Sequence, residues 1–391
     1  MSMQNKRGIK YFFQFFFYLG GIACLTSYLN VYLEKVLGFS GTELGIYTGL
    51  TSFLPAFFVP IISYYGDKIK KHKMIFVGVI GLQIICAILL SMQKSVVMVV
   101  LIGMVMEIAH YTAQPLADTL TTQFAAKEHV NYGILRSGGS FGFTLGGVMA
   151  GILVSKLGNW SIIFPLYIGC LVMAFVCGMT FSREEEKTEA KPLHFQDVAL
   201  LLKNPSYLLA ILLMLTATMS TDGLLSYIGN HLTTTLGAEA TSISINTAVC
   251  VVPEFVLLPL CGALLPKIGY RKCYLISAIC LVIRFAIYSI APTAGIFIVG
   301  SVLQAFTVCC STVVNMAFLK RIVPSALLAT AVTVGYSFAN LGRAVFSFFF
   351  GKLYQNVGSF AIFRLMLILQ VVMLLVVATT KHLEVSVEAE K

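Results

Sequence analysis

Two stretches of this sequence decide the fold. Residues 27–73 read SYLNVYLEKVLGFSGTELGIYTGLTSFLPAFFVPIISYYGDKIKKHK, and residues 226–272 read SYIGNHLTTTLGAEATSISINTAVCVVPEFVLLPLCGALLPKIGYRK. They lie 199 residues apart and align without a gap, with twelve of 47 positions identical. The identical pairs include Tyr28/Tyr227, Leu37/Leu236, Gly38/Gly237 and Pro60/Pro259. The match predicts a doubled half, an arrangement typical of membrane bundles that carry solutes.

Composition places most of the chain in lipid. Of 391 residues, 58% are hydrophobic and 11% are charged, and the mean hydropathy is +0.88. Soluble domains carry about 25% charged residues, so an ordinary soluble protein is excluded. A membrane-spanning helix needs about 20 apolar residues, and we count twelve such runs, continuous rather than alternating as in a barrel. They lie near 11–33, 42–65, 74–92, 95–122, 132–155, 160–181, 206–232, 242–265, 273–291, 293–319, 327–354 and 359–380.

Basic residues are sorted by side of the predicted membrane, although the net charge is +10. Nineteen Lys and Arg residues fall at the termini and in loops that join even to odd spans, and four fall in the opposite loops. Cytoplasmic loops carry such an excess. We therefore expect a multi-pass protein of the cell membrane with both termini cytoplasmic, and no nucleic-acid partner.

The composition changes at one internal segment. Residues 182–205 contain the charged run Arg183–Lys187 and are too polar to enter lipid. We expect a cytoplasmic linker there. It divides an N-terminal six-helix half (1–181) from a C-terminal six-helix half (206–380), and a cytoplasmic tail (381–391) follows.

Motifs of enzymes are missing from the sequence. It contains no Walker loop, no HExxH and no nucleophile elbow. The ten cysteines lie almost wholly within apolar runs, without a pairing framework or metal-ligand spacing, and are expected to be packing residues. We therefore predict no enzyme, no catalytic residue, no metal site and no cofactor; the energy must come from a gradient.

Two loops carry a motif. Ser63–Lys73 read SYYGDKIKKHK, and Gly262–Lys272 read GALLPKIGYRK. Both resemble the cytoplasmic signature of the major facilitator superfamily, a Gly, three residues, Asp-Arg/Lys, two residues and a basic cluster, present once in each half. The first copy departs from it at Ser63 and Lys70, and the second at Pro266. The resemblance implies an all-α membrane protein with 12 transmembrane helices in two pseudo-symmetric six-helix halves around a central cavity, usually a monomer.

In that family this loop gates transport without contacting the substrate. An acid that faces basic residues at helix ends can hold one conformation of a two-state protein. The resemblance therefore makes Asp67, Lys68, Lys267 and Arg271 candidate gating residues. The alternative is that the basic cluster only sets the topology.

Eight ionisable side chains fall inside predicted spans, where each costs roughly 2.5–3.5 kcal/mol. Such groups pair or line an aqueous cavity. In the fourth span Glu107, Tyr111, Gln114 and Asp118 recur at i, i+4, i+7 and i+11, which places them on one helical face. This stripe is predicted to line a pore; alternatively, its members hydrogen-bond to a neighbouring helix. The eight are Glu107, Asp118, Asp222, Glu254, Arg136, Arg284, Arg343 and Arg364.

Residues 118–143 resemble the fourth-to-fifth-helix segment of the lactose permease and its phenylpropionate-permease and nucleoside-symporter relatives. Asp118 stands eighteen residues before Arg136, the spacing of a carboxylate and an arginine in the permease's substrate site. Phe143 takes the place of its sugar-stacking tryptophan and lacks the indole donor, which argues against a galactoside. The predicted substrate-binding residues are Asp118, Arg136, Phe143, Gln114, Tyr111 and Asp222.

Glu254 and Arg284 are the predicted proton-coupling pair. In the permease an arginine at the ninth-helix position of Arg284 takes part in proton coupling. A carboxyl group in a low-dielectric cavity can take up a proton and release it when an arginine approaches. Alternatively the two form a static ion pair, or Asp222 or Glu107 carries the proton, or coupling is absent. Asp222 has its own alternative, a structural pair with Arg343.

These observations predict a secondary active transporter whose partners are a small-molecule solute, the proton and the lipid bilayer. The solute is small and polar or aromatic, with sugar, glycoside or nucleoside favoured, and uptake proceeds by proton symport through alternating access. A proton-antiport exporter and a facilitator are alternatives within transport. A solute-sensing membrane receptor is the alternative outside it.

Overall fold

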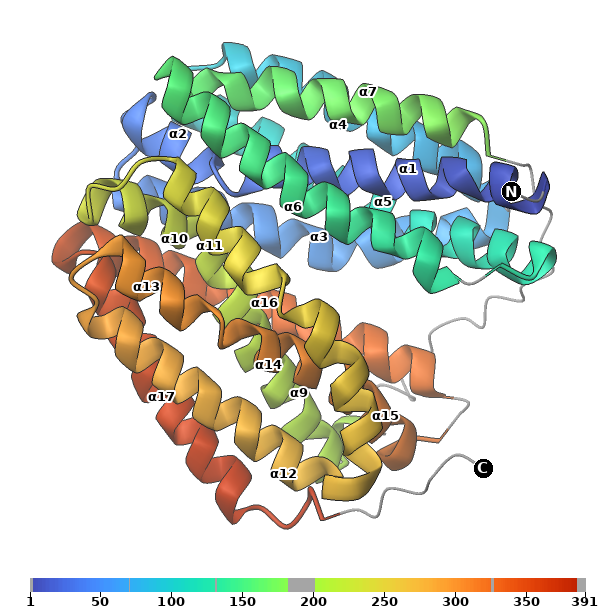
Figure 1. Ribbon diagram of the computed structural model, residues 1–391, viewed down its shortest axis with the longest axis vertical. Coiled ribbons are helices and arrows are strands. Elements are labelled where there is room, and N and C mark those ends of the chain that lie inside the picture. Colours follow the sequence, from blue (N-terminus) through green and yellow to red (C-terminus); the bar gives the residue numbers. More distant parts are fainter. Residues whose placement is uncertain (1–2, 70, 131, 182–200, 325–326, 385–391) are drawn as a thin grey trace. The chain divides into compact units, whose positions relative to one another are not determined.

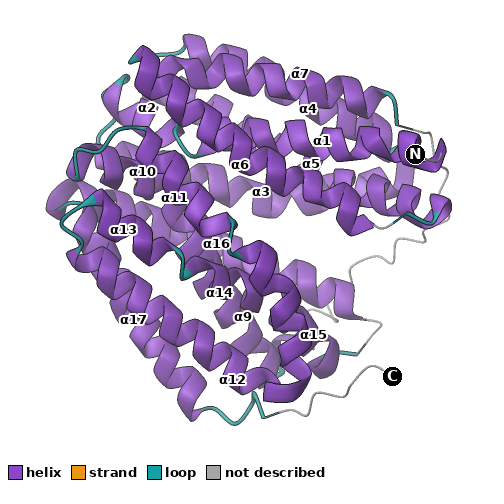
Figure 2. Cartoon of the chain, viewed as in Figure 1, coloured by secondary structure: helices purple, strands orange, loops and turns teal. Residues whose placement is uncertain are grey.

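The computed structural model describes residues 3–69, 71–130, 132–181, 201–324 and 327–384. Within these ranges all regular structure is helical (Figures 1 and 2), which confirms the all-α prediction. The chain divides into two compact units, which are described separately below. Unit 1 comprises Met1–Pro192 and Glu239–Ser244, and unit 2 comprises Leu193–Ala238 and Ile245–Lys391. Most of the expected linker, 182–200, and the tail from 385 lie outside the described residues.

Unit 1 contains the first six predicted spans. The first span consists of two helices, because a turn at Ser27 and Tyr28 interrupts it. The helices are α1 (Met3–Thr26), α2 (Leu29–Lys35), α3 (Gly41–Ile69), α4 (His72–Met92), α5 (Val96–Glu128), α6 (Tyr132–Leu157), the short η1 (Trp160–Ile162) and α7 (Ile163–Met179).

Unit 2 contains most of the last six spans and is less regular. Three π-helical turns interrupt two of them: η2 (Met219–Gly223), η3 (His231–Thr235) and η4 (Cys310–Val314). The α-helices are α9 (Pro205–Thr218), α10 (Leu224–Asn230), α11 (Thr241–Val251), α12 (Glu254–Ile290), α13 (Ala294–Ser301), α14 (Gln304–Cys309), α15 (Asn315–Ile322), α16 (Leu328–Val357) and α17 (Ser359–Thr379).

Ten helical segments of the described residues are long and apolar enough to cross a membrane. With α3 and α16, which have 29 and 30 residues, they account for the twelve expected spans. One boundary differs from expectation. No separate loop divides the eighth and ninth spans, because α12 includes the second part of the eighth span and the whole of the ninth and is broken only at Gly269, with φ of 78° and ψ of 164°. A positive φ favours glycine, so a single residue makes this bend. The first part of the eighth span is α11.

The duplication is visible in the backbone of both units. Gly38 and Gly237, aligned in the repeat, have φ of 73° and 65°. Tyr28 and Tyr227, also aligned, are fully buried. The Tyr28 hydroxyl donates to a carbonyl oxygen of α6 at 2.7 Å, and the Tyr227 hydroxyl donates to one of α16 at 3.2 Å. Equivalent tyrosines therefore fix equivalent helix pairs; their acceptors are Gly147 and Ser347.

In unit 1, α6 packs along α1 with the two backbones in contact (Figure 1). Gly138, Gly142 and Gly146 recur every four residues on the face of α6 that meets α1. A Cβ atom added to any of them would overlap a carbonyl oxygen of α1. Small residues at this spacing let membrane helices approach closely. The oxygens belong to Phe12, Phe16 and Gly20.

Candidate functional site

Asp118 and Arg136, which the sequence assigns to one site, form an ion pair in unit 1. The Arg136 Nε atom lies 3.1 Å from Asp118 Oδ1, and the Tyr132 hydroxyl donates to the same oxygen at 2.8 Å. The chain turns back after α5 at His129, whose φ of 54° is left-handed, so α6 returns beside the end of α5. The side chains of Arg136 and Asp118 remain 28% and 35% exposed. A solute could therefore reach the pair.

An aromatic ring of α1 contacts the arginine of this pair. The Arg136 guanidinium lies over the Phe15 ring, 4.8 Å from its centroid, a cation–π arrangement. Phe143 follows Arg136 by seven residues and Gln114 precedes Asp118 by four, so each shares a helical face with its member of the pair. Both are half-buried. The sequence did not single out Phe15, because nothing in the aromatic run of α1 distinguishes one ring from the next.

The two acidic residues of the predicted polar stripe on α5 lie in different surroundings. Eleven residues separate Glu107 from Asp118, about 16 Å along an α-helix. Glu107 interacts electrostatically with Tyr18, Tyr47 and Tyr167, which are buried and come from α1, α3 and α7. Glu107 thus belongs to the interior of unit 1 and does not join the Asp118–Arg136 pair.

Tyr111 lies at the edge of the same interior cluster. Its ring contacts the His110 ring edge-on, with 5.1 Å between centroids. The His110 Nδ1 atom lies 2.9 Å from the Tyr18 hydroxyl, and the Tyr167 hydroxyl donates to Gln83 at 3.1 Å. These hydrogen bonds join α1, α4, α5 and α7. Glu107 and Tyr111 therefore lie next to a hydrogen-bonded cluster in the interior of unit 1, which is the setting that the structural alternative considered above requires.

Asp222 and Glu254 line one cavity of about 300 Å³ in unit 2. Asp222 lies in the π-helical turn η2, a kind of irregularity common at functional sites. Glu254 is the first residue of α12, directly after Pro253. Polar side chains from α14, η4 and α16 complete the lining, so the cavity offers acceptors and donors to a polar solute. The other lining residues are Met214, Ala217, Thr218, Thr221, Gln304, Val308, Ser311 and Tyr336.

The expected pair of Glu254 with Arg284 is not formed. Arg284 is fully buried, and its guanidinium donates to the Tyr288 hydroxyl at 3.1 Å, the Ser220 carbonyl at 3.1 Å and Gln304 Oε1 at 2.6 Å. Within the described part of the chain all these partners are neutral. Tyr288 is one turn away on the same helix and Ser220 lies in η2, so nearby oxygens satisfy the arginine without the carboxylate.

Gln304 connects Arg284 to the cavity. A guanidinium has only donors, so the oxygen of the Gln304 amide must face Arg284. The amide nitrogen is then left as a donor for the cavity that Gln304 lines. Gln304 and Tyr336 were not among the predicted site residues, because uncharged polar side chains are common in spans and carry no distinctive signal.

Asp222 lies beside a cation. Its carboxylate interacts electrostatically with Arg343 of α16. The Arg343 side chain packs against the next residue, with its Cγ atom 3.4 Å from a Cβ placed on Gly223. Among the described residues, by contrast, no cation forms an ion pair with Glu254. Its carboxylate is therefore the one in this cavity without a neutralising partner.

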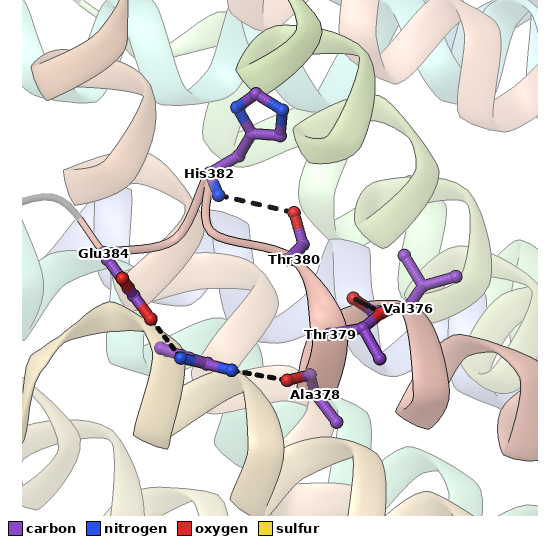
Figure 3. Close-up of polar contacts among 7 residues, drawn as sticks. Val376, Ala378, Thr379, Thr380, His382 and Glu384 are labelled. Atoms are coloured by element: carbon purple, nitrogen blue, oxygen red, sulfur yellow. Dashed lines mark hydrogen bonds and ion pairs between the residues drawn. The ribbon is translucent and has the colours of Figure 1, made fainter.

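Of the four predicted gating residues, Arg271 has defined contacts. Its guanidinium pairs with the Glu384 carboxylate and donates to the Ala378 carbonyl near the end of α17 (Figure 3). A cation there also interacts favourably with the helix dipole. The acid thus comes from the tail, a segment to which the sequence analysis assigned no gating residue. Lys267 lies four residues before Arg271, on the other side of the break at Gly269, and is exposed. The side chains of Asp67 and Lys68 lie outside the described part of the structure.

Comparison with protein families decides the identity. The family model "MFS_1 like family" matches residues 9–365, which is most of the chain. The chain belongs to this family of major facilitator superfamily transporters. The expectation drawn from the two loops is confirmed: this MFS protein is an integral, multi-pass membrane transporter and not an enzyme.

Several curated relatives resemble this MFS chain over most of its length. The uncharacterized transporter YwbF of Bacillus subtilis (strain 168) is 23% identical over 375 residues, covering 95% of this chain and 92% of the relative. The maltose permease of Geobacillus stearothermophilus is 22% identical, with 83% and 81% covered. The probable 3-phenylpropionic acid transporter of Escherichia coli (strain K12) is 25% identical, with 62% and 64% covered.

A solved structure supports the fold. The crystal structure of a point mutant of the nucleoside transporter NupG superimposes with a TM-score of 0.83 at 14% identity, covering 95% of this chain and 98% of the other. At this identity the likeness establishes the MFS fold and nothing about the solute.

Proposed function

We propose that this MFS protein takes up a small polar or aromatic solute by proton symport through alternating access, with sugar, glycoside or nucleoside favoured. The observation that carries the proposal is the unit 2 cavity, where Glu254 lines a polar space without an ion-pairing cation among the described residues. A buried carboxylate without such a partner is costly while it is charged. It is therefore the group best suited to take up and release a proton.

The other groups around Glu254 are less suited to carry the proton. Asp222 is the second carboxylate of the cavity, and Arg343 offsets its charge. Tyr336 lines the cavity, and the thiol of Cys250 interacts electrostatically with Glu254. Free phenols and thiols titrate near 10 and about 8.5, and loss of water raises both values further, whereas the same effect moves a carboxyl group from about 4.3 toward neutral pH. A carboxylate is therefore the group here whose protonation a physiological proton gradient can change.

The hydrogen-bond donors and acceptors of both units support the proposed class of solute. Asp118 with Arg136 in unit 1, and Gln304 with the hydroxyls of the unit 2 cavity, can hydrogen-bond to a solute that carries both donors and acceptors. The names of the relatives mention maltose, 3-phenylpropionic acid and nucleosides. Phe143, two turns along α6 from Arg136, could offer its ring to a sugar or base. We further propose a monomer in the cell membrane with both termini cytoplasmic, because most loop lysines and arginines would then be inside.

Transport by reconstituted protein tests the proposal. Proteoliposomes are supplied with labelled maltose, uridine or 3-phenylpropionate, with an inward proton gradient and with or without a protonophore. The gradient should drive accumulation and the protonophore should abolish it. Stimulation by an outward gradient instead would show antiport, and binding without counterflow would show a receptor.

Two matched variants of the cavity test the role of Glu254. Glu254→Gln should retain counterflow exchange and lose the pH dependence of uptake, because an amide takes up no proton in this range. Asp222→Asn, in the same cavity, should keep that pH dependence. If Glu254→Gln retains the pH dependence and Asp222→Asn or Glu107→Gln loses it, the proton is carried elsewhere and the assignment is wrong.

A further inference from the structure

Four of the ten cysteines line a second, smaller cavity of unit 2. It has a volume of about 110 Å³ and shares no lining residue with the cavity of Asp222 and Glu254. Cys261 and Cys273 come from α12, Cys309 ends α14 and Cys310 begins η4. All ten cysteines have free thiols. The transport mechanism proposed above uses none of these four.

Two of the four thiols come from opposite sides of the break in α12. Cys261 precedes Gly269 and Cys273 follows it, so the two residues occupy different arms of the helix. Both residues nevertheless line the same cavity of about 110 Å³, and their thiols interact electrostatically. Cys261 also donates weakly to the Cys309 carbonyl, with 4.0 Å between sulfur and oxygen. Two thiols that line one small cavity can bind one atom that needs two sulfur ligands.

The remaining lining of this cavity is apolar and reaches the surface. Leu260, Leu264 and Ile276 line it and are 46%, 37% and 44% exposed. They belong to a segment long and apolar enough to cross the membrane. Compounds that dissolve in the bilayer therefore have an apolar route to the thiols, whereas hydrated ions do not.

We propose that Cys261 and Cys273 form a two-thiol site for apolar compounds of trivalent arsenic. With phenylarsine oxide, two As–S bonds form, the As=O oxygen leaves as water with the two thiol protons, and arsenic stays trivalent. Among the described residues no three His, Cys, Asp or Glu side chains are placed to hold a metal ion, so a ligand that needs only two sulfurs fits the geometry. The adduct would tie the two arms of α12 together across Gly269.

Mass spectrometry of purified protein with phenylarsine oxide tests the site. The thiols of Cys24 and Cys170 in unit 1 also interact electrostatically, so all proteins carry Cys170→Ala. One phenylarsenic group should add per chain with loss of two hydrogens, and peptide mapping should place it on Cys261 and Cys273. Excess monothiol should leave the adduct in place and 2,3-dimercaptopropanol should remove it, because chelation by two linked sulfurs raises the effective concentration of the second.

Matched variants decide the assignment. Cys261→Ser and Cys273→Ser should each need a roughly tenfold or higher reagent concentration for half-labelling, because the second sulfur of the chelate is lost. Cys280→Ser, on the same helix but outside the cavity, should label like the parent. Labelling of the parent protein is a direct test even where a variant fails to fold. The proposal is overturned if the parent takes up no arsenic, if mapping places it on other cysteines, or if both variants label like Cys280→Ser.

Discussion

Replacing Gly142 by alanine should loosen the contact between α1 and α6. A Cβ atom at Gly142 would overlap the carbonyl oxygen of Phe16, and the carbonyl carbon and Cα of Phe16 lie close behind it, at 2.6 and 2.8 Å. From the other side, a Cβ at Gly20 would lie 3.0 Å from the Gly142 oxygen. These obstacles are backbone atoms, so no rotation of a side chain can relieve the overlap. The two helices must move apart.

The size of the effect follows from two opposing terms. Overpacking of a tight interior costs about 1–3 kcal/mol, and a backbone obstacle places this site at the upper end. Alanine is better than glycine inside a helix by about 1 kcal/mol, which offsets part of the loss. The net destabilisation is then about 2 kcal/mol. At about 2–4 °C per kcal/mol for a unit of this size, the melting temperature should fall by roughly 4–8 °C.

Thermal unfolding in detergent, followed by tryptophan fluorescence, measures this change. Trp160 is the only tryptophan and lies in η1 of unit 1, so its emission reports on the right unit. Gly78→Ala in α4 and Gly169→Ala in α7 are matched controls, because a Cβ at either position meets no atom within 4 Å. Both should melt at or slightly above the parent temperature. Equal melting of Gly142→Ala and these controls would refute the close-packing argument.

Two further substitutions test unit 2. Arg284→Lys should destabilise the protein by about 1–3 kcal/mol, because an ammonium cannot reach Tyr288, Ser220 and Gln304 together and leaves buried acceptors unsatisfied. Unfolding followed by circular dichroism measures this loss, and an unchanged melting curve would contradict the hydrogen-bond network. Arg271→Ala should change stability by less than about 1 kcal/mol, because both partners of its ion pair are exposed. If the contact gates transport, Glu384→Gln and Arg271→Ala should alter transport rates in the same direction. Opposite effects of these two variants on proteoliposome uptake would separate the residues and exclude a shared latch.

Much of the fold follows from the sequence because the duplication constrains it twice. A glycine at the same place in both copies predicts one backbone conformation, and Gly38 and Gly237 both have positive φ. A tyrosine at the same place predicts one buried contact, and Tyr28 and Tyr227 both donate to a carbonyl oxygen of a later helix. The resemblance to the permease segment assigned Asp118 and Arg136 to one substrate site, and in the structure the two side chains form an ion pair beside the short connection between α5 and α6.

Other features depend on tertiary contacts that periodicity does not encode. The break at Gly269 replaces a loop because one glycine with positive φ suffices to redirect the chain. The partners of Arg284 are oxygens of Ser220, Tyr288 and Gln304, and no charge pattern in the sequence distinguishes them from many other uncharged polar groups. The partner of Arg271 is Glu384, which follows it by 113 residues.

The placement of charge differs between the units in a way that bears on coupling. In unit 1 the carboxylate of Asp118 forms an ion pair with Arg136. In unit 2 Arg284 is held by neutral oxygens, and Arg343 lies beside Asp222. Among the described residues no cation forms an ion pair with the Glu254 carboxylate, so in a low-dielectric site protonation is the least costly way to neutralise it. A helix rearrangement that brought Arg284 to Glu254 would first have to release the Gln304 oxygen, which would leave this cavity-lining amide free to turn and its oxygen free to accept a new hydrogen bond. Proton release from Glu254 and a change in the hydrogen-bonding groups that face the solute would then occur in one step, as the proposed symport needs.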